Sequence, residues 1–318
     1  MHNDRSSEMQ RVAIAPLQSL IPDAAEKIVS DVTRQINRMA RDSIRAETGL
    51  RLSDETYRGG IPIKVVPGFP LSLTQLVERH PDPTLWRLIS LRPKLISVSD
   101  SLKELLVHWN EFEAWDGLPT TAKNAGPTLR RSLEISESLS ALAAVDALLN
   151  EISLIEDDIL GAYWHGQHIE IYWMAITLFS AAFGVRIEDL TSVAMIHELT
   201  HAYTHLARDI DGSMWEAGGF EQSEPAVIEG LAQYYTATVT QKLASRLPSA
   251  HHAYQTLLQY QSGPYHSHLA WFDENVAVDG RGEVVRSALL QARKAGKVTN
   301  RTWRTMLQHA QLRFPPDP

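Results

Sequence analysis

The chain contains no cysteine, so disulfide bonds are excluded and any metal ion must be held by histidine or carboxylate side chains. It also lacks a long apolar run: the longest, at residues 172–185, falls short of the roughly 20 residues that a membrane-spanning helix needs. Basic residues do not predominate, because 30 Lys and Arg residues stand against 38 Asp and Glu residues and give a net charge of −8. A general nucleic-acid binder, which needs a basic face, is therefore not expected.

The first 20 residues lack a basic segment followed by an apolar stretch, so no signal peptide is expected and the default prediction is a cytoplasmic protein. Secretion without a leader stays open. The chain has 318 residues, of which 44% are hydrophobic, enough for one large core or two ordinary ones. We expect neither a membrane nor a nucleic acid among its partners, and the sequence does not indicate an oligomeric state.

Patterns along the chain predict a mostly helical α+β protein. Apolar residues recur at helical spacing within 22–47 and from about 128 to 154. Another helix is expected to start near Ser101, where Ser-Leu-Lys-Glu has the form of a capping box. The β-branched and aromatic residues of 159–176 predict a hairpin that turns around Gly166.

Near residue 155 the composition changes from a helical pattern rich in Leu and Ala to β-branched and aromatic residues, which suggests a division of the chain there. Residues 1–155 are predicted to form a helical N-terminal region, whose role the sequence does not indicate. Residues 156–318 are predicted to form the region that carries the chemistry. After the hairpin this region is expected to be helical, with helices over 188–207, 224–246, 250–261, 282–295 and 300–312.

The expected helix 188–207 contains His197-Glu198-Leu199-Thr200-His201, which has the form H-E-x-x-H. Residues four apart differ by about 40° around a helix and about 6 Å along it, so the two imidazoles can converge on one ion. Glu198 projects to the side of that pair, from where its carboxylate can take a proton from a water on the ion. The motif predicts one Zn²⁺ ion held by His197 and His201, with Glu198 as general base.

The third ligand must be His, Asp or Glu, and we look for it downstream. Glu229 lies between Ile228 and Leu231 in an apolar helical segment, where a buried carboxylate needs a strong partner such as zinc. We therefore predict Glu229 as the third ligand. Glu224 is the alternative, although its place at the start of the helix favours a capping role.

Two more polar residues lie near these ligands. His205 continues the four-residue series, but it lies a further turn along the helix, too far to share the same ion. We interpret it as a polar residue near the helix end, where the helix dipole favours a cation. Gln233, one turn after Glu229, is either exposed or hydrogen-bonded to the free ring nitrogen of His197 or His201.

The combination of HELTH at 197–201 and IEGLAQYY at 228–235 resembles the gluzincin class of zinc metallopeptidases. It is most similar to the thermolysin-like group, over about residues 160–236. This resemblance implies a zincin-like region with a small antiparallel or mixed sheet beside the H-E-x-x-H helix and a helical lower lobe. It also implies a downstream Tyr or His that stabilises the oxyanion, for which Tyr265 and His268 are equal candidates ahead of His266. Tyr234 and Tyr235 are further candidates.

The segment Ala162-Tyr163-Trp164-His165-Gly166 resembles the edge strand of the same group. The resemblance implies that Ala162, Tyr163 and Trp164 bind the backbone of a peptide substrate by β-addition. The chain also departs from the group's pattern: His201 and Glu229 are 28 positions apart, which is longer than usual, and Gly161 stands where the group has asparagine.

These residues together predict a zinc-dependent metallopeptidase that acts on a peptide or protein substrate. Two alternatives stay open. One is a regulatory or partner-binding protein that uses a zincin scaffold without hydrolysis, and the other is a toxin or defence protease of narrow specificity. The sequence indicates neither the cleavage-site preference nor an endo or exo mode.

Overall fold

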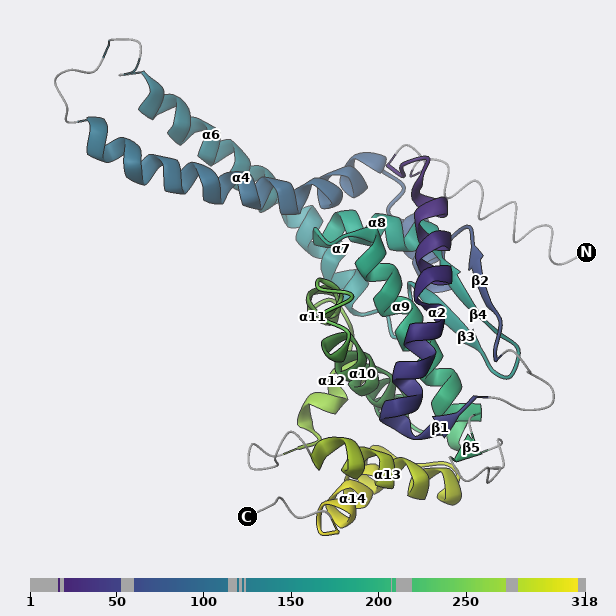
Figure 1. Ribbon diagram of the computed structural model, residues 1–318. Helices are drawn as coiled ribbons and strands as arrows, with labels where there is room; N and C mark the ends of the chain where they lie inside the picture. Colours follow the sequence, from purple (N-terminus) through teal and green to yellow (C-terminus); the bar gives the residue numbers. More distant parts are fainter. Residues whose placement is uncertain are drawn as a thin grey trace, which may run out of the picture.

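A computed structural model describes residues 17, 20–52, 60–113, 119, 122, 124–206, 208–209, 219–272 and 280–313. It confirms a mostly helical α+β fold with a small mixed sheet (Figure 1). Within these ranges, none of the helices combines the length and apolar character that crossing a membrane requires.

Helix α9, Ile187–Leu206, carries the H-E-x-x-H motif and forms the centre of the molecule. Every residue from Asp189 to His205 is buried, because neighbouring helices cover α9 on several sides. These neighbours are α2 (Ala25–Thr48), α8 (Trp173–Phe183), α10 (Pro225–Lys242) and α11 (Ala250–Leu258). The polar residues of the motif are thus held among apolar ones, where they need partners.

The main sheet has the strand order β2-β4-β3. The strands β3 (Gly161–Trp164) and β4 (His168–Tyr172) form the predicted antiparallel hairpin, and Gly166 takes a φ of 66° in its turn. Strand β2 (Ile63–Val66) pairs with β4 in parallel. Both strands of the hairpin contact α9, so the predicted small sheet beside the motif helix is confirmed.

The side chains of β4 alternate between two faces, as the period of a strand requires. Ile169 and Ile171 are fully buried in the core. On the other face, the Glu170 carboxylate accepts a hydrogen bond of 2.9 Å from the Tyr172 hydroxyl and lies 3.1 Å from the His168 ring. This alternation fixes which face of the hairpin packs on α9.

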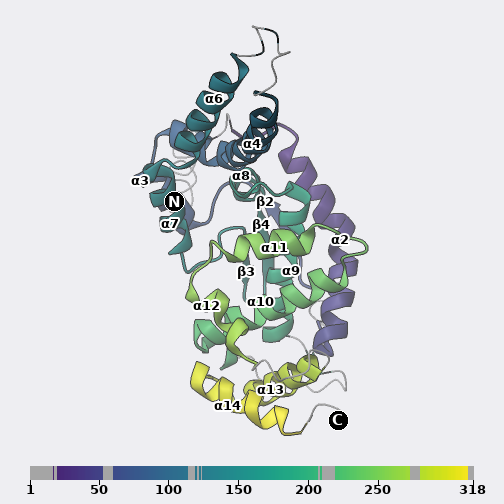
Figure 2. The ribbon, with the colours of Figure 1, turned by 90° about the vertical axis from the view of Figure 1, so that its left-hand side faces the viewer.

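A long helical hairpin projects from one end of the molecule (Figures 1 and 2). It consists of α4 (Pro83–Glu113) and α6 (Ala125–Ser140). The prediction of a helix start near Ser101 was wrong, because Ser101 lies inside α4 and its hydroxyl donates to the Ser97 carbonyl oxygen. The single helix predicted from 128 to 154 is also wrong, since it divides into α6 and α7 (Ala143–Ser153).

The chain after α9 is helical, as predicted. Its end forms α13 (Arg281–Ala295) and α14 (Asn300–Gln311), which lie at the opposite end of the molecule from α4 and α6 (Figures 1 and 2). The short elements are β1 (Leu50–Arg51) paired with β5 (Arg208–Asp209), α3 (Leu71–Arg79), η1 (Phe220–Gln222), α12 (Gly263–His266) and η2 (Ser267–Ala270).

Residues on both sides of the division predicted near residue 155 contribute to one core. Strand β2 pairs with β4 across that point, and α2 packs along α9. The core cluster includes Val29 and Ile36 of α2 together with Leu190 and Ile196 of α9. The early part of the chain therefore supports the motif helix directly.

Candidate metal centre

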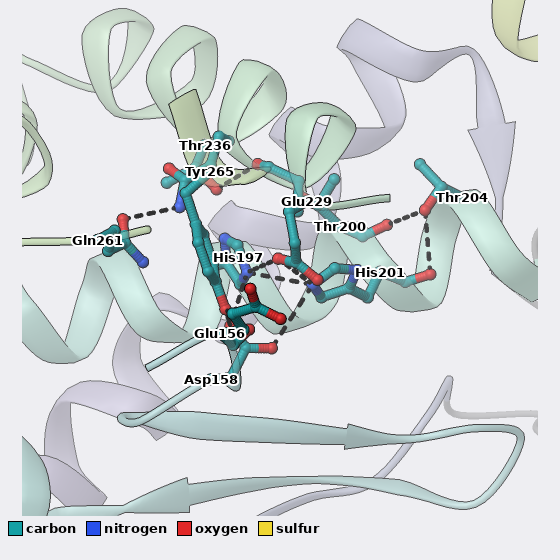
Figure 3. A network of polar contacts seen from close by, with 12 residues as sticks. Glu156, Asp158, His197, Thr200, His201, Thr204, Glu229, Thr236, Gln261 and Tyr265 are labelled. Atoms are coloured by element: carbon teal, nitrogen blue, oxygen red, sulfur yellow. Dashed lines mark hydrogen bonds and ion pairs between the residues drawn. The ribbon is translucent and has the colours of Figure 1, made fainter. Parts of the chain in front are cut away.

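Four side chains converge on one point beside α9: Asp158, His197, His201 and Glu229 (Figure 3). Each offers one possible ligand atom, and these atoms all lie within 4.8 Å of one another. The two histidines come from α9, Glu229 comes from α10, and Asp158 comes from the segment between α7 and β3. The structure thus brings together the three ligands predicted from the sequence and adds a fourth.

The donor atoms lie close enough together to surround one ion. The Nε2 atoms of His197 and His201 are 3.1 Å apart. Asp158 Oδ1 lies 3.2 Å from His197 Nε2 and Asp158 Oδ2 lies 3.7 Å from His201 Nε2, and Glu229 Oε2 lies 3.3 and 3.5 Å from the two nitrogens. Donors that sit about 2.0–2.1 Å from a tetrahedral zinc ion are separated from one another by about 3.3–3.4 Å.

The charges of the cluster also call for a cation. Glu229 Oε2 is buried and forms no hydrogen bond, although it faces both histidines. Burial lowers the pKa of His197, but the Asp158 carboxylate outweighs this effect and leaves that pKa well above its ordinary value. Burial raises the pKa of Glu229, but His201 and His197 outweigh it, so that pKa lies below its ordinary value. Positive charge at this point therefore stabilises the carboxylates, and a bound divalent ion would add to it.

Glu198 lies beside the donor group and is not a member of it. Its side chain is buried, its Oε2 atom has no hydrogen-bond partner, and its carboxylate accepts a hydrogen bond from the backbone of Tyr163. Burial raises the pKa of Glu198 well above its ordinary value, and the nearby Asp158 carboxylate adds to this effect. The structure thus places an unpartnered carboxyl oxygen of Glu198 within electrostatic range of Asp158, His197 and Glu229.

Gly161 allows strand β3 to approach Glu198 closely. A Cβ atom at this position would lie 2.7 Å from Glu198 Cγ and 2.8 Å from its Oε1. A side chain of any size would displace Glu198 or the strand. Glycine at position 161 therefore has a steric reason in this structure.

We expect Gly161→Ala to destabilise the protein by about 1–3 kcal/mol, because it overpacks a buried contact. Thermal unfolding of the two proteins measures this difference. The control is Gly282→Ala in the first turn of α13, where nothing lies within 4 Å of the added Cβ, so no loss of stability is expected. Equal unfolding temperatures for Gly161→Ala and the wild type would contradict the close approach.

Tyr265 reaches the donor group. Its hydroxyl lies 2.8 Å from Asp158 Oδ1, to which it donates, and 3.2 Å from the Glu156 carbonyl oxygen. Its ring stacks on His197, with ring centroids 6.0 Å apart. Burial raises the pKa of the Tyr265 hydroxyl well above its ordinary value, so this group stays protonated and remains a donor.

Two of the other candidates for the oxyanion donor, His268 and His266, have partners elsewhere. Burial lowers the pKa of His268 to about 4. This neutral ring donates from Nδ1 to the Tyr265 carbonyl oxygen and accepts at Nε2 from the Tyr254 hydroxyl, each at 2.9 Å. His268 also lines a separate cavity of about 1070 Å³ between α10, α11 and α13. His266 Nε2 donates to the Leu258 carbonyl oxygen at 2.7 Å.

His205 lies outside the donor group, as predicted. The interpretation of this residue as a cation near the helix end is wrong, because burial, followed by the nearby His201, lowers its pKa well below the ordinary value. The ring packs against Tyr163 and Phe220, with centroids 5.5 and 5.9 Å away. It serves as part of the packing next to the ligands.

Gln233 is buried, and its amide nitrogen donates to Gln261 Oε1 at 3.0 Å. The structure thus pairs it with Gln261 instead of a histidine ring. Glu224, the alternative ligand, lies outside the donor group and accepts a hydrogen bond of 2.8 Å from the Asn300 backbone. Its capping role is therefore at the start of α14.

Strand β3 forms an edge of the sheet next to the donor group, since among the described residues only β4 pairs with it. Ala162 and Tyr163 are half-buried and Trp164 is exposed. The Tyr163 ring stacks on His201, with an angle of 10° between the rings. The predicted peptide-binding residues thus lie on the edge strand of the sheet. The ring of one of them, Tyr163, contacts the predicted ligand His201.

Comparison with protein-family models, with curated proteins and with solved structures finds no match to this chain. The inference of function therefore depends on the chemistry of the site.

Proposed function

We propose that this protein is a zinc-dependent peptidase in which His197, His201 and Glu229 hold the ion and Glu198 is the general base. The observation that carries the proposal is the buried, unpartnered Glu198 oxygen beside a group of four donor atoms that all lie within 4.8 Å of one another. A zinc ion held there would act as a Lewis acid and would lower the pKa of the water molecule bound to it to about 7.

The surrounding residues suit the remaining tasks of peptide hydrolysis. Glu198 takes a proton from water and passes it to the leaving amine. The protonated Tyr265 hydroxyl donates to Asp158 Oδ1 in this structure, and it would become available to an oxyanion once Asp158 moves away. The free edge of β3 can orient a peptide through backbone hydrogen bonds.

The experiment that tests the proposal measures zinc content and cleavage together. The purified protein is expected to bind one zinc ion per chain and to cleave members of a peptide library. Removal of the metal by a chelator should abolish cleavage, and added zinc should restore it. A protein that binds one zinc ion and cleaves no peptide would refute the peptidase assignment while leaving the metal site intact.

Asp158 favours a second candidate, a metal-binding protein without hydrolysis. Structural zinc sites have four protein ligands, whereas catalytic sites keep one position for water. With Asp158 in the donor set, all four positions are filled by the protein. Under the peptidase proposal Asp158 must leave its position to admit water, and two features favour this: it lies outside helices and strands, and with 21% exposure it is the most exposed of the four.

Asp158→Asn separates the two candidates. A neutral amide is a weaker ligand than a carboxylate, so the peptidase proposal predicts one bound zinc ion per chain and cleavage that is at least as fast as in the wild type. Zinc titration and peptide cleavage under the same conditions measure both quantities. A variant that loses zinc altogether would indicate that Asp158 is a permanent fourth ligand and would favour the second candidate.

A further inference from the structure

The cavity of about 1070 Å³ that His268 lines lies on the side of α10 that faces away from the metal centre. The α10 residues in its wall are centred about 150° around the helix from Glu229. The end of α2, helix α11, the segment 268–272 and the start of α13 form the other walls. A cavity of this volume is large enough for a small organic molecule.

The interior of this cavity carries positive charge. Arg281 and Arg286 of α13 are half-buried in its wall, whereas the acidic Glu283 of the same helix is exposed. The Glu47 carboxylate also lines the cavity, but it is paired with Lys242 at 2.6 Å. Among the described lining residues, three basic side chains thus stand against two acidic ones, although the whole chain has a net charge of −8. This balance favours an anionic ligand with a single charge.

The two arginines are held in place by contacts with neighbouring elements. The guanidinium carbon of Arg281 lies 5.2 Å from the centre of the Phe272 ring. Arg286 Nε donates to the Thr48 carbonyl oxygen at 3.0 Å, and Gly49 leaves room for this guanidinium, with which any Cβ atom at position 49 would collide. A guanidinium has five N–H donors and can bind a carboxylate through two of them while it keeps other contacts.

Aromatic rings form much of the remaining wall. The rings of Tyr234 and Phe272 have centroids 6.3 Å apart, and those of His251 and Tyr254 stack at 5.7 Å. Burial lowers the pKa of His251, so its ring is neutral near pH 7 and adds no charge. Such surfaces bind planar apolar groups by stacking and edge contacts. The ligand is therefore expected to have an aromatic body in addition to its charge.

Tyr254 and His268 separate this cavity from the metal centre. Both are buried, and the Tyr254 hydroxyl donates to His268 Nε2 at 2.9 Å. Behind them, His268 Nδ1 donates to the Tyr265 carbonyl oxygen, and the Tyr265 hydroxyl reaches Asp158. The cavity and the donor group are thus distinct sites, and a ligand in the cavity has no contact with the metal.

We propose that this cavity binds a small aromatic carboxylate, whose charge is held by Arg281 and Arg286 and whose ring lies against Tyr234 and Phe272. A carboxylate carries one negative charge, which matches the excess of one basic residue in the lining. A phosphate monoester carries nearly two negative charges near pH 7 and matches this balance less well. The proposal does not depend on the function of the metal site.

The test is isothermal titration calorimetry of the full chain with N-acetyl-phenylalanine as the probe. We expect one probe molecule to bind per chain with a Kd below about 1 mM. N-acetyl-phenylalanine amide has the same ring without the charge, and N-acetyl-alanine has the same charge without the ring. Each is expected to bind at least about 10-fold more weakly than the probe, because each lacks one of the two recognised groups.

Three variants locate the probe in the cavity. Arg281→Gln is expected to raise the Kd by a factor of about 10–100 through the loss of a charge-assisted contact. Ala237→Trp fills the space beside α10 and should abolish binding without removing any charged group. The control is Arg304→Gln, which changes an exposed arginine of α14 outside the described lining and should leave the Kd unchanged. Circular dichroism checks that each variant is folded.

The titration is repeated with zinc-loaded and with chelator-treated protein, and the Kd should be the same in both. Binding that occurs only in the zinc-loaded protein would place the carboxylate on the metal and overturn the proposal. It is also overturned if no saturable binding is seen up to roughly 10 mM probe, if the amide binds as tightly as the acid, or if folded Arg281→Gln and Ala237→Trp both keep the wild-type Kd.

Discussion

Replacement of Glu198 by glutamine is expected to reduce peptide cleavage by a factor of about 10²–10⁴ while leaving the zinc content at one ion per chain. Glutamine has nearly the size of glutamate and fits the same buried space beside Gly161. It cannot accept a proton from water. Because Glu198 is not a member of the donor group, its replacement leaves the ligands in place.

Metal analysis and cleavage rates of the two proteins, measured on the same preparations, check this result. Glu188→Gln is a suitable control, because Glu188 is a carboxylate at the start of the same helix and pairs with Arg186 at 3.0 Å, away from the donor group. It should retain both zinc and cleavage. Full activity of Glu198→Gln would remove this residue from the reaction and with it the main support for a peptidase.

The second large effect is expected at Glu229. Structural zinc sites bind with about 10–16 kcal/mol in total, so the loss of one ligand in four corresponds to about 3 kcal/mol, or a zinc affinity lower by a factor of about 100 or more. Glu229→Ala should show this loss in a titration against a zinc chelator of known affinity.

Glu224→Ala is the matched control, because it removes a carboxylate five positions earlier in the chain that caps α14 instead of facing the histidines. We expect it to keep the zinc affinity of the wild type and to lose only a little stability, about 1 kcal/mol, measured by thermal unfolding. If Glu224→Ala lost zinc and Glu229→Ala kept it, the assignment of the third ligand would be reversed.

The sequence was most informative where geometry is local. His197 and His201 are one turn apart on a single helix, so their convergence follows from the helix alone. The largely covered position of Glu229, 15% exposed, followed from the apolar residues around it, and the turn at Gly166 followed from its short hairpin pattern. In these cases the relevant neighbours are within a few residues in the chain.

Asp158 was missed because the search for a further ligand looked only downstream of the histidines. The signal was present, since Glu156, Asp157 and Asp158 form an acidic group directly before the predicted strand. Its meaning depends on the path of the segment after α7, which brings Asp158 against His197 and Tyr265. Tertiary contacts of this kind produce no regular spacing of residues that could be recognised in the sequence.

The start of α4 was misjudged for a related reason. Ser101 and the three residues after it have the form of a cap, but the apolar repeat that packs on α6 continues through that point. Pro93, which would normally end a helix, lies inside α4 as well. Tertiary packing of the long hairpin thus outweighs two local signals. The choice of Tyr265 over His268 likewise required the structure, because both lie in one short segment with different partners.

The parallel pairing of β2 with β4 has a consequence for how the protein folds. It joins residues 63–66 to residues 169–172, and the donor group adds contacts from Asp158 to Glu229. Contacts between such distant parts of a chain form slowly, because the entropy of closing long loops is lost before the contacts are gained. In an unfolded chain, only the helical pair His197 and His201 lies close enough in sequence to share an ion. If this site holds zinc as proposed, the ion would bind the native state far more tightly than the unfolded one, and its addition should slow unfolding and leave the early steps of folding unchanged.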